Sequence, residues 1–182
     1  MKKTSVFQKD LYRYYGDRKE TLRERLFRPI ELRYIKVLRR AQASSNPFCR
    51  AYYKLRLRRL AEKSHIQIPV STQIGEGFYI GHTGRVIINP NAKLGKNINL
   101  GTGVTIGQEN RGERKGVPTL SDNVWVGTNA VLVGKITIGT DVLIAPLTFV
   151  NFDVPPHSIV VGNPAKIIHR ENATEGYLNK TV

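Results

Sequence analysis

The sequence predicts a mainly β protein, a parallel β-helix of hexapeptide repeats preceded by a basic α-helical region. Two observations predict the β-helix. Aliphatic residues recur every six positions, and in the stretch IINPNAKLGKNINLGTGVTIG (residues 87–107) glycine follows three of the four. A third observation sets the N-terminal region apart: residues 1–65 contain 19 Lys and Arg against 6 Asp and Glu, whereas residues 66–182 contain 10 against 8. The chain therefore has two parts of different character.

In the basic part, apolar residues recur at intervals of three or four. They do so in TLRERLFRPIELRYIKVLRRA and in PFCRAYYKLRLRRLAEK. This spacing is typical of amphipathic helices. Pro29 and the segment SSNP at residues 44–47 interrupt the pattern. We therefore expect two or three short helices within residues 1–65.

From residue 66 onward the period changes to six. The aliphatic markers fall in three runs, at Ile68, Ile74 and Ile80, at Ile88, Leu94, Leu100 and Ile106, and at Leu120, Val126, Leu132, Ile138, Ile144 and Val150. A helix would repeat every 3.6 residues and an ordinary half-buried strand every 2. A period of six instead fits short strands joined by tight turns, with three hexapeptides closing one triangular coil and the coils stacking around an apolar interior.

Two breaks in the period indicate where function lies. The step from Ile80 to Ile88 contains GHTGRVI and includes His82, and the step from Ile106 to Leu120 contains GQENRGERKGVP. Extra residues at a repeat corner project from one face of a solenoid, which is frequently the binding face. We therefore expect His82 and a polar loop from Gln108 to Val117 to belong to a site.

Length and composition set further bounds. A chain of 182 residues with 40% hydrophobic residues can form one domain with a packed core. It contains neither a run of about 18 apolar residues nor the apolar core of a secretory signal. Cys49 is the only cysteine. We therefore expect a cytoplasmic protein without an internal disulfide.

The repeats resemble those of the hexapeptide-repeat acyltransferases, and YIGHTGRVIINPNAKLGKN resembles the active-site segment of serine acetyltransferases. It resembles most the relatives that acetylate surface polysaccharides, the colanic acid type. The resemblance covers about residues 66–170. It implies a left-handed parallel β-helix over 66–152 and a closing segment over 153–182, preceded by the basic helical region over 1–65 that the apolar spacing predicts. It also implies a homotrimeric O-acetyltransferase that uses acetyl-CoA and requires no metal.

The resemblance assigns His82 as the general base. An imidazole with a pKa near ~6.5 can accept the proton of a hydroxyl that attacks a thioester. Serine acetyltransferases have an Asp fifteen residues before this histidine, where the present chain has Gln67, which could fix the imidazole tautomer by a neutral hydrogen bond. Cys49 lies outside the repeats and no GxSxG segment is present. Direct transfer without an acyl-enzyme is therefore expected.

The acceptor site departs from that of serine acetyltransferases. The family has an Asp directly before the base and an Arg-His pair later, whereas this chain has Gly81, Gly116 and Val117. The loop offers hydrogen-bonding and charged groups instead, with Glu109, Asn110, Arg111 and Arg114 as candidate acceptor ligands. We therefore expect a hydroxyl of a sugar or surface-polysaccharide precursor as the acceptor. Free L-serine, as in cysteine biosynthesis, is the alternative.

The resemblance also supplies candidate contacts for the coenzyme. Gly107 is a candidate backbone donor to the oxyanion. The remaining candidates are small residues that follow repeat markers and basic residues of the closing segment: Gly127, Thr128, Ala145, Asn151, Lys166 and Arg170.

The basic region has three interpretations. The first is a cap on the trimer, and the second is contact with anionic lipid at the inner face of the membrane, which would suit an enzyme of lipid-linked sugars. The third is nucleic-acid binding, which is disfavoured because the arginines are mixed with apolar residues at helical spacing and match no recognition motif. A non-enzymatic, structural β-helix is a distant alternative.

Overall fold

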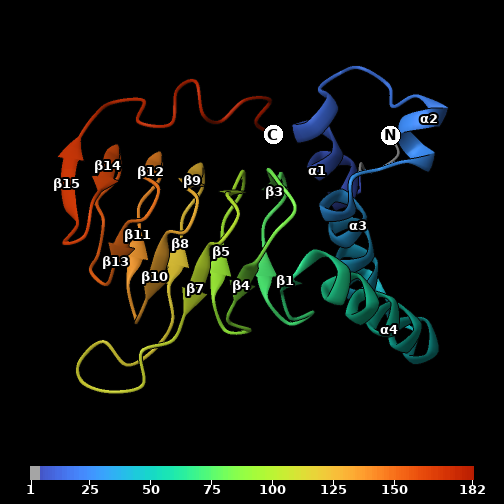
Figure 1. Cartoon of the computed structure of the whole chain (residues 1–182), viewed down its shortest axis with the longest axis horizontal. Coiled ribbons are helices and arrows are strands. Elements are labelled where there is room, and N and C mark those ends of the chain that lie inside the picture. The colour runs from blue at the N-terminus through green and yellow to red at the C-terminus, as the bar shows by residue number, and fades with distance from the viewer. Residues whose placement is uncertain (1–4) are drawn as a thin grey trace.

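The computed structural model describes residues 5–182. Four helices gather at one end of a parallel β-helix, and the C-terminal segment returns along the outside of the coils toward them (Figure 1). The helices are α1 (Val6–Tyr15), α2 (Leu22–Leu26), α3 (Ile30–Ala43) and α4 (Pro47–Ser64). The mainly β fold class predicted from the sequence is confirmed, and the basic region is helical as expected, with four helices instead of two or three.

The strands form three sheets, which we call A, B and C, and each of the first four coils contributes a strand to all three. The last coil contributes strands to sheets A and C, and beside sheet B it forms only an isolated bridge between Val154 and Ile138. Sheet A contains β1 (Ile66–Gln67), β4 (Val86–Ile88), β7 (Thr105–Gly107), β10 (Val131–Val133) and β13 (Phe149–Val150). Sheet B contains β2 (Gln73–Ile74), β5 (Lys93–Leu94), β8 (Thr119–Leu120) and β11 (Thr137–Ile138). Sheet C contains β3 (Tyr79–Ile80), β6 (Asn99–Leu100), β9 (Val124–Val126), β12 (Val142–Ile144), β14 (Ser158–Val161) and β15 (Lys166–His169).

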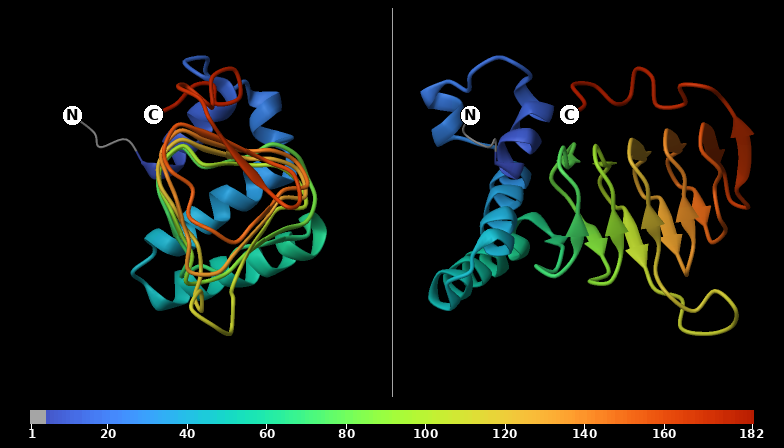
Figure 2. Two further views of the ribbon diagram at one scale, coloured as in Figure 1. Left: turned by 90° about the vertical axis from the view of Figure 1, so that its left-hand side faces the viewer. Right: turned by 180° about the vertical axis from the view of Figure 1, so that it is seen from behind.

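The register explains the period of six. Ile88 pairs with Ile106 in sheet A, and Leu94 pairs with Leu120 in sheet B, so successive markers stack directly above one another. Twelve of the thirteen marker side chains are at most 4% exposed; Ile74, in the first coil, is partly buried. Viewed along the axis, the coils superimpose as a rounded triangle (Figure 2, left). The markers therefore form the apolar interior that the sequence predicted.

The end of the β-helix differs from the expected boundary at residue 152. β14 pairs in parallel with β12, so the solenoid continues to Val161. β15 then pairs antiparallel with β14 and ends the sheet. Antiparallel pairing requires no further coil, and this reversal directs the chain back along the solenoid.

Buried polar contacts join the helices to the first coil. The guanidinium of Arg39 on α3 donates to both carboxylate oxygens of Asp10 on α1, at 2.7 and 3.1 Å, and to the carbonyls of Ile74 and Gly75. Asp10 also accepts the amide of Phe78 at 2.9 Å. Burial raises the pKa of Asp10, while Arg39 opposes that change. The helices therefore close the open end of the β-helix.

The three corners of the triangle have different surroundings. The tail corner (75–77, 95–97, 121–123, 139–141 and 156–157) joins sheet B to sheet C and lies under the C-terminal segment. The His82 corner (81–84, 101–103, 127–129 and 145–147) joins sheet C to sheet A. The loop corner (89–91, 107–118, 133–135 and 151–153) joins sheet A to sheet B and carries the long excursion visible below the coils in Figure 1.

Candidate functional site

His82 is exposed at the His82 corner, in the turn between β3 and β4. The turn is longer than its counterparts in later coils, and Gly84 within it has φ of +151°, a conformation that side chains disfavour. Among the residues that the structure describes, none hydrogen-bonds to the His82 ring. The imidazole is therefore available to a ligand at the surface of the chain.

A carboxylate from the helical region anchors the His82 turn. The hydroxyl of Thr83 donates to Glu31, at the start of α3, over 2.8 Å, and Glu31 is only 7% exposed. The Tyr14 hydroxyl holds the strand just before the turn, donating to the Ile80 carbonyl at 2.9 Å and accepting the Ile80 amide at 3.2 Å. Burial raises the pKa of Tyr14 well above its usual value, so this phenol stays neutral. Helices α1 and α3 thus fix the segment that presents His82.

Sequence reasoning missed Glu31 and Tyr14. Glu31 is 52 positions from Thr83, and Tyr14 is 66 positions from Ile80. In the sequence, both residues look like ordinary members of amphipathic helices. No local pattern marks them, because their partners are set by how the helices dock on the first coil.

Gln67 lies on β1 in sheet A, paired in register with Ile87. It lines a cavity of about 370 Å³ between the first coil and the helices, together with Tyr34, Lys54 and Val70. In the described part of the chain, no hydrogen bond joins Gln67 to His82. Its expected role in orienting the imidazole remains a prediction.

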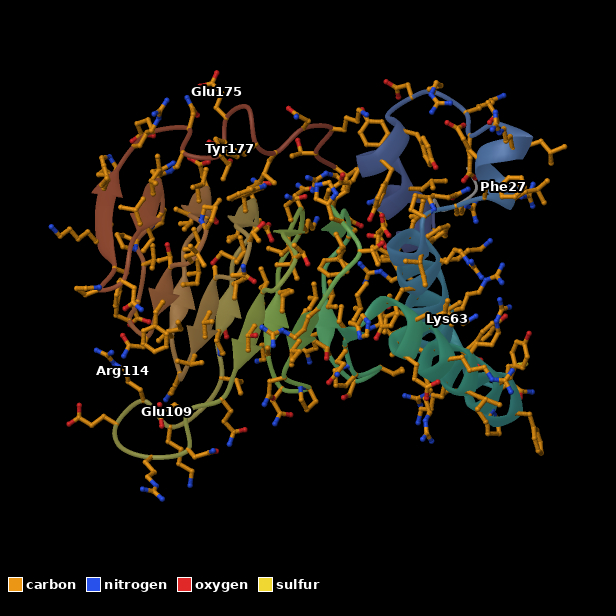
Figure 3. The ribbon with its side chains drawn as sticks, viewed as in Figure 1. Phe27, Lys63, Glu109, Arg114, Glu175 and Tyr177 are labelled. Atoms are coloured by element: carbon orange, nitrogen blue, oxygen red, sulfur yellow. The ribbon has the colours of Figure 1, made fainter. Side chains whose placement is uncertain are left out.

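The loop leaves the solenoid at Gly107 and folds onto later coils. Glu109 and Gly116 exchange backbone hydrogen bonds of 3.0 Å, and Lys135 donates its amide to the carbonyl of Arg114 at 2.9 Å. The guanidinium of Arg114 donates to the carbonyl of Asn151. Figure 3 shows Glu109 and Arg114 at this corner. The loop is therefore an ordered hairpin at the loop corner.

The four candidate acceptor ligands within the loop differ in availability. Glu109 accepts the amides of Asn110 and Arg111, and the side chain of Asn110 accepts from Gln108 at 2.6 Å. The Arg111 side chain is exposed. Glu109 and Asn110 therefore help to shape the hairpin itself. His82 lies at a different corner, so sheet A separates the expected base from the expected acceptor ligands within one chain.

The candidate coenzyme residues are likewise divided between the His82 corner and the loop corner. Gly127, Thr128 and Ala145 stack at the His82 corner, and Gly107 and Asn151 lie at the loop corner. A Cβ at Gly127 would lie 2.6 Å from the nitrogen of Pro146, so coil stacking alone already requires glycine there. Lys166 and Arg170 are exposed at the two ends of β15, in the last part of the solenoid.

The tail corner holds its side chains in a continuous network. Asp141 accepts the amides of Ala173 and Thr174 at 2.9 Å and the Thr174 hydroxyl at 2.6 Å, and His157 lies 3.0 Å from it. Burial raises the pKa of Asp141, but these hydrogen bonds outweigh burial, so the pKa is lower than usual. Asn97 exchanges two hydrogen bonds with the backbone of Val182. His157 therefore belongs to the network that holds the C-terminal segment.

No family model matches the chain. Serine acetyltransferase 2 of Arabidopsis thaliana is 34% identical over 110 residues, which are 60% of this chain and 34% of that protein. Serine acetyltransferase of Helicobacter pylori is 35% identical over 106 residues, which are 58% of this chain and 62% of that protein. The chain spans about half the length of the curated relatives it matches.

Solved structures extend the similarity into the helical region. Serine acetyltransferase of Neisseria gonorrhoeae in complex with serine superimposes with a TM-score of 0.73 and 27% identity, over 90% of this chain and 67% of that one. The soybean apoenzyme gives a TM-score of 0.75 and 25% identity, over 90% and 68% of the two chains. The fold is that of the serine acetyltransferases. The expected closeness to polysaccharide acetyltransferases remains a prediction, since these relatives are all serine acetyltransferases.

Within residues 5–182, no three His, Cys, Asp or Glu side chains gather as a metal site would require. In that same range, no helix is both long enough and apolar enough to cross a bilayer.

Proposed function

We propose that the protein is an acetyl-CoA-dependent O-acetyltransferase in which His82 is the general base. The observation that carries this proposal is the exposure of His82, on a turn held by α1 and α3, in a chain with the serine acetyltransferase fold. The similarity of the chain to serine acetyltransferases supports the reaction class.

In the proposed reaction, His82 takes the proton of the acceptor hydroxyl as its oxygen attacks the thioester carbonyl carbon. A tetrahedral oxyanion forms, and the amide of Gly107 is the candidate donor to it. The carbon–sulfur bond then breaks, and the imidazolium returns its proton to the departing thiolate. The products are the acetyl ester and free coenzyme A, and no covalent acyl-enzyme forms.

The donor would lie along the stacked turns of the His82 corner. Thr128 is exposed there and Ala145 is partly exposed, so both can contact a ligand. A serine acetyltransferase of Brucella abortus with this fold, 22% identical, has been solved with coenzyme A. Asn151, Lys166 and Arg170 are the candidate contacts for the distal part of the donor, with the two cations suited to phosphates.

The site requires a second copy of the chain. Sheet A separates His82 from the loop within one chain, yet both flank the same sheet. The outward residues of that sheet include Ile87, Val131 and Phe149, which are all partly exposed in the single chain. An apolar sheet face of this kind favours association, and a cyclic trimer would bring the His82 corner of one copy toward the loop corner of the next.

The acceptor has two candidates. The named relatives favour L-serine, and one of their structures contains it. The residues at the acceptor positions favour a sugar hydroxyl, because Gly81, Gly116 and Val117 offer neither a carboxylate for the ammonium nor a cation for the carboxylate of serine. We therefore place L-serine first, which reverses the order expected from the sequence, and keep a sugar hydroxyl as the second candidate.

The experiment offers acetyl-CoA with L-serine and with a panel of sugars and sugar nucleotides, and identifies the products by mass spectrometry. O-acetylserine alone would select the first candidate, and an acetylated sugar alone the second. No release of coenzyme A with any acceptor would contradict the proposal.

The same assay tests the role of Gln67 with two matched variants, Gln67→Glu and Gln67→Leu. If Gln67 orients the imidazole by a hydrogen bond, the Glu variant should be active and the Leu variant impaired. Equal activity of the two variants would exclude that role.

A further inference from the structure

Two helices of the N-terminal region expose apolar side chains that no other part of residues 5–182 covers. On α2 and just after it, Leu22, Leu26 and Phe27 are each more than half exposed. On α4 the same holds for Phe48, Tyr52 and Leu55. Both helices lie at the end of the molecule opposite β15 (Figures 1 and 2). We call these six residues, with the cations around them, the end surface.

Helix α4 is apolar on two opposite faces. Its inner face carries the buried Leu57 and Leu60 and packs on α3 and the first coil. Phe48, Tyr52 and Leu55 are four and three residues apart, so they form one stripe along the helix. At 100° per residue, this stripe points away from Leu57 and Leu60. The outer stripe thus contributes nothing to the core of the chain and is available to a partner.

The helices of the end surface carry mostly unpaired positive charge. Helix α4 carries six cations, namely Arg50, Lys54, Arg56, Arg58, Arg59 and Lys63, and one acid, Glu62. Across the described residues, Arg58 is the only one of these cations in an ion pair, at 3.6 Å from Glu62. Arg23 and Arg25 are likewise exposed beside Leu22 and Leu26 on α2. Figure 3 labels Phe27 and Lys63 on this end of the molecule.

We propose that the end surface docks on the face of an anionic lipid bilayer. Apolar side chains that protrude between cations match the two regions of such a bilayer surface. The aromatic rings and leucines would enter the acyl boundary, and the cations would meet the anionic headgroups. A second copy of the chain would instead place two strongly basic surfaces in contact. Nucleic acid would satisfy the cations but leave the six apolar side chains without a partner.

Symmetry strengthens this docking mode. In a closed cyclic assembly, every copy presents the same end on the same side of the ring. Three end surfaces would then meet one membrane plane together, and weak single contacts would add through effective concentration. The inference does not depend on the proposed enzyme activity, and its test uses no substrate.

The test uses Cys49, the only cysteine, which is exposed on α4 beside Phe48. The whole 182-residue chain is labelled there with an environment-sensitive fluorophore. It is then titrated with vesicles of phosphatidylcholine, either alone or with about 30% phosphatidylglycerol. A blue shift and a gain in intensity are expected only with the anionic vesicles. Cosedimentation of unlabelled protein measures the partition coefficient independently of the label.

Variants separate docking from misfolding. Phe48→Ser with Leu55→Ser should lower the partition coefficient at least tenfold, with the melting temperature unchanged because both side chains are exposed. Ile168→Ser, at an exposed apolar site on β15, is the matched control and should bind as the parent does. The proposal is overturned if anionic vesicles produce no response. It is also overturned if the double variant binds normally, if duplex DNA or RNA binds more tightly than vesicles, or if the double variant only abolishes a larger oligomer.

Discussion

The tail corner and the His82 corner have the same repeat geometry but opposite surroundings. At the tail corner, Asn97 hydrogen-bonds to Asn123 and to the C-terminal segment. Asp141 likewise contacts His157 and the C-terminal segment. At the His82 corner, His82 and Thr128 are exposed and their side chains have no hydrogen-bond partner among the described residues. Polar groups that are satisfied within the chain stabilise it, whereas polar groups left open can serve a ligand. We infer that the tail corner stabilises the solenoid and that the His82 corner is available for function.

The largest effect expected from this difference is on turnover. His82→Ala should lower kcat by about 10²–10⁴-fold, the usual contribution of a general base. The melting temperature should not change, because the ring has no hydrogen-bond partner in the part of the chain that the structure describes. Steady-state release of coenzyme A and thermal unfolding measure the two effects. His157→Ala is the control at the tail corner, with normal kcat and a lower melting temperature, and a reversed pattern would contradict the assignment.

The next effect is on stability at the tail corner. Asn97 has φ of +54° and exchanges two hydrogen bonds with Val182. Asn97→Ala should therefore reduce the free energy of unfolding by about 2 kcal/mol, from lost hydrogen bonds and the cost of Ala in a left-handed conformation. Thr128→Ala at the His82 corner should change it by less than about 0.5 kcal/mol. Equal losses in chemical denaturation would show that the two corners do not differ in this way.

A pH titration tests how Asp141 holds the tail. Its pKa is below the ordinary value of 3.8 in the folded protein, so its contribution is complete above that value. The contribution is lost as pH falls through the lower, folded pKa. The tail should therefore detach in acid, and the fluorescence of Trp125, whose ring lies 5.0 Å from that of Tyr177, should change.

Asp141→Asn serves as the matched variant for that titration. It should reduce the free energy of unfolding by about 1 kcal/mol at neutral pH, because its hydrogen bonds are weaker. It should also remove the acid transition in the fluorescence of Trp125. An unchanged transition in the variant would mean that another carboxyl group releases the tail.

The smallest expected effect on stability concerns the loop corner. Arg114→Ala removes an exposed contact to the Asn151 carbonyl and should change the free energy of unfolding by less than about 0.5 kcal/mol. If the loop selects the acceptor, the same variant should raise the KM of the acceptor and leave that of acetyl-CoA unchanged. A change confined to the KM of acetyl-CoA would instead place Arg114 with the donor.

The sequence predicted those features that each coil specifies locally. Leu100 and Ile138 are fully buried because their six-residue spacing places them inside every coil, and the break before Ile88 located His82 at a corner. Contacts between distant segments could not be predicted. Glu31 reaches Thr83, and the tail reaches Asp141, only because of how the helices and the C-terminal segment dock on a finished solenoid. Such docking has no repeating signature in the chain.

Hydrogen–deuterium exchange with and without coenzyme A tests the division between the corners most directly. We expect the coenzyme to slow exchange in the turns of the His82 corner, at residues 127–129 and 145–147, and to leave the tail corner at 121–123 and 139–141 unchanged. The His82→Ala variant should show the same protection, because His82 is assigned to proton transfer and not to donor binding. Protection centred on the tail corner, with none at residues 127–129, would contradict the account.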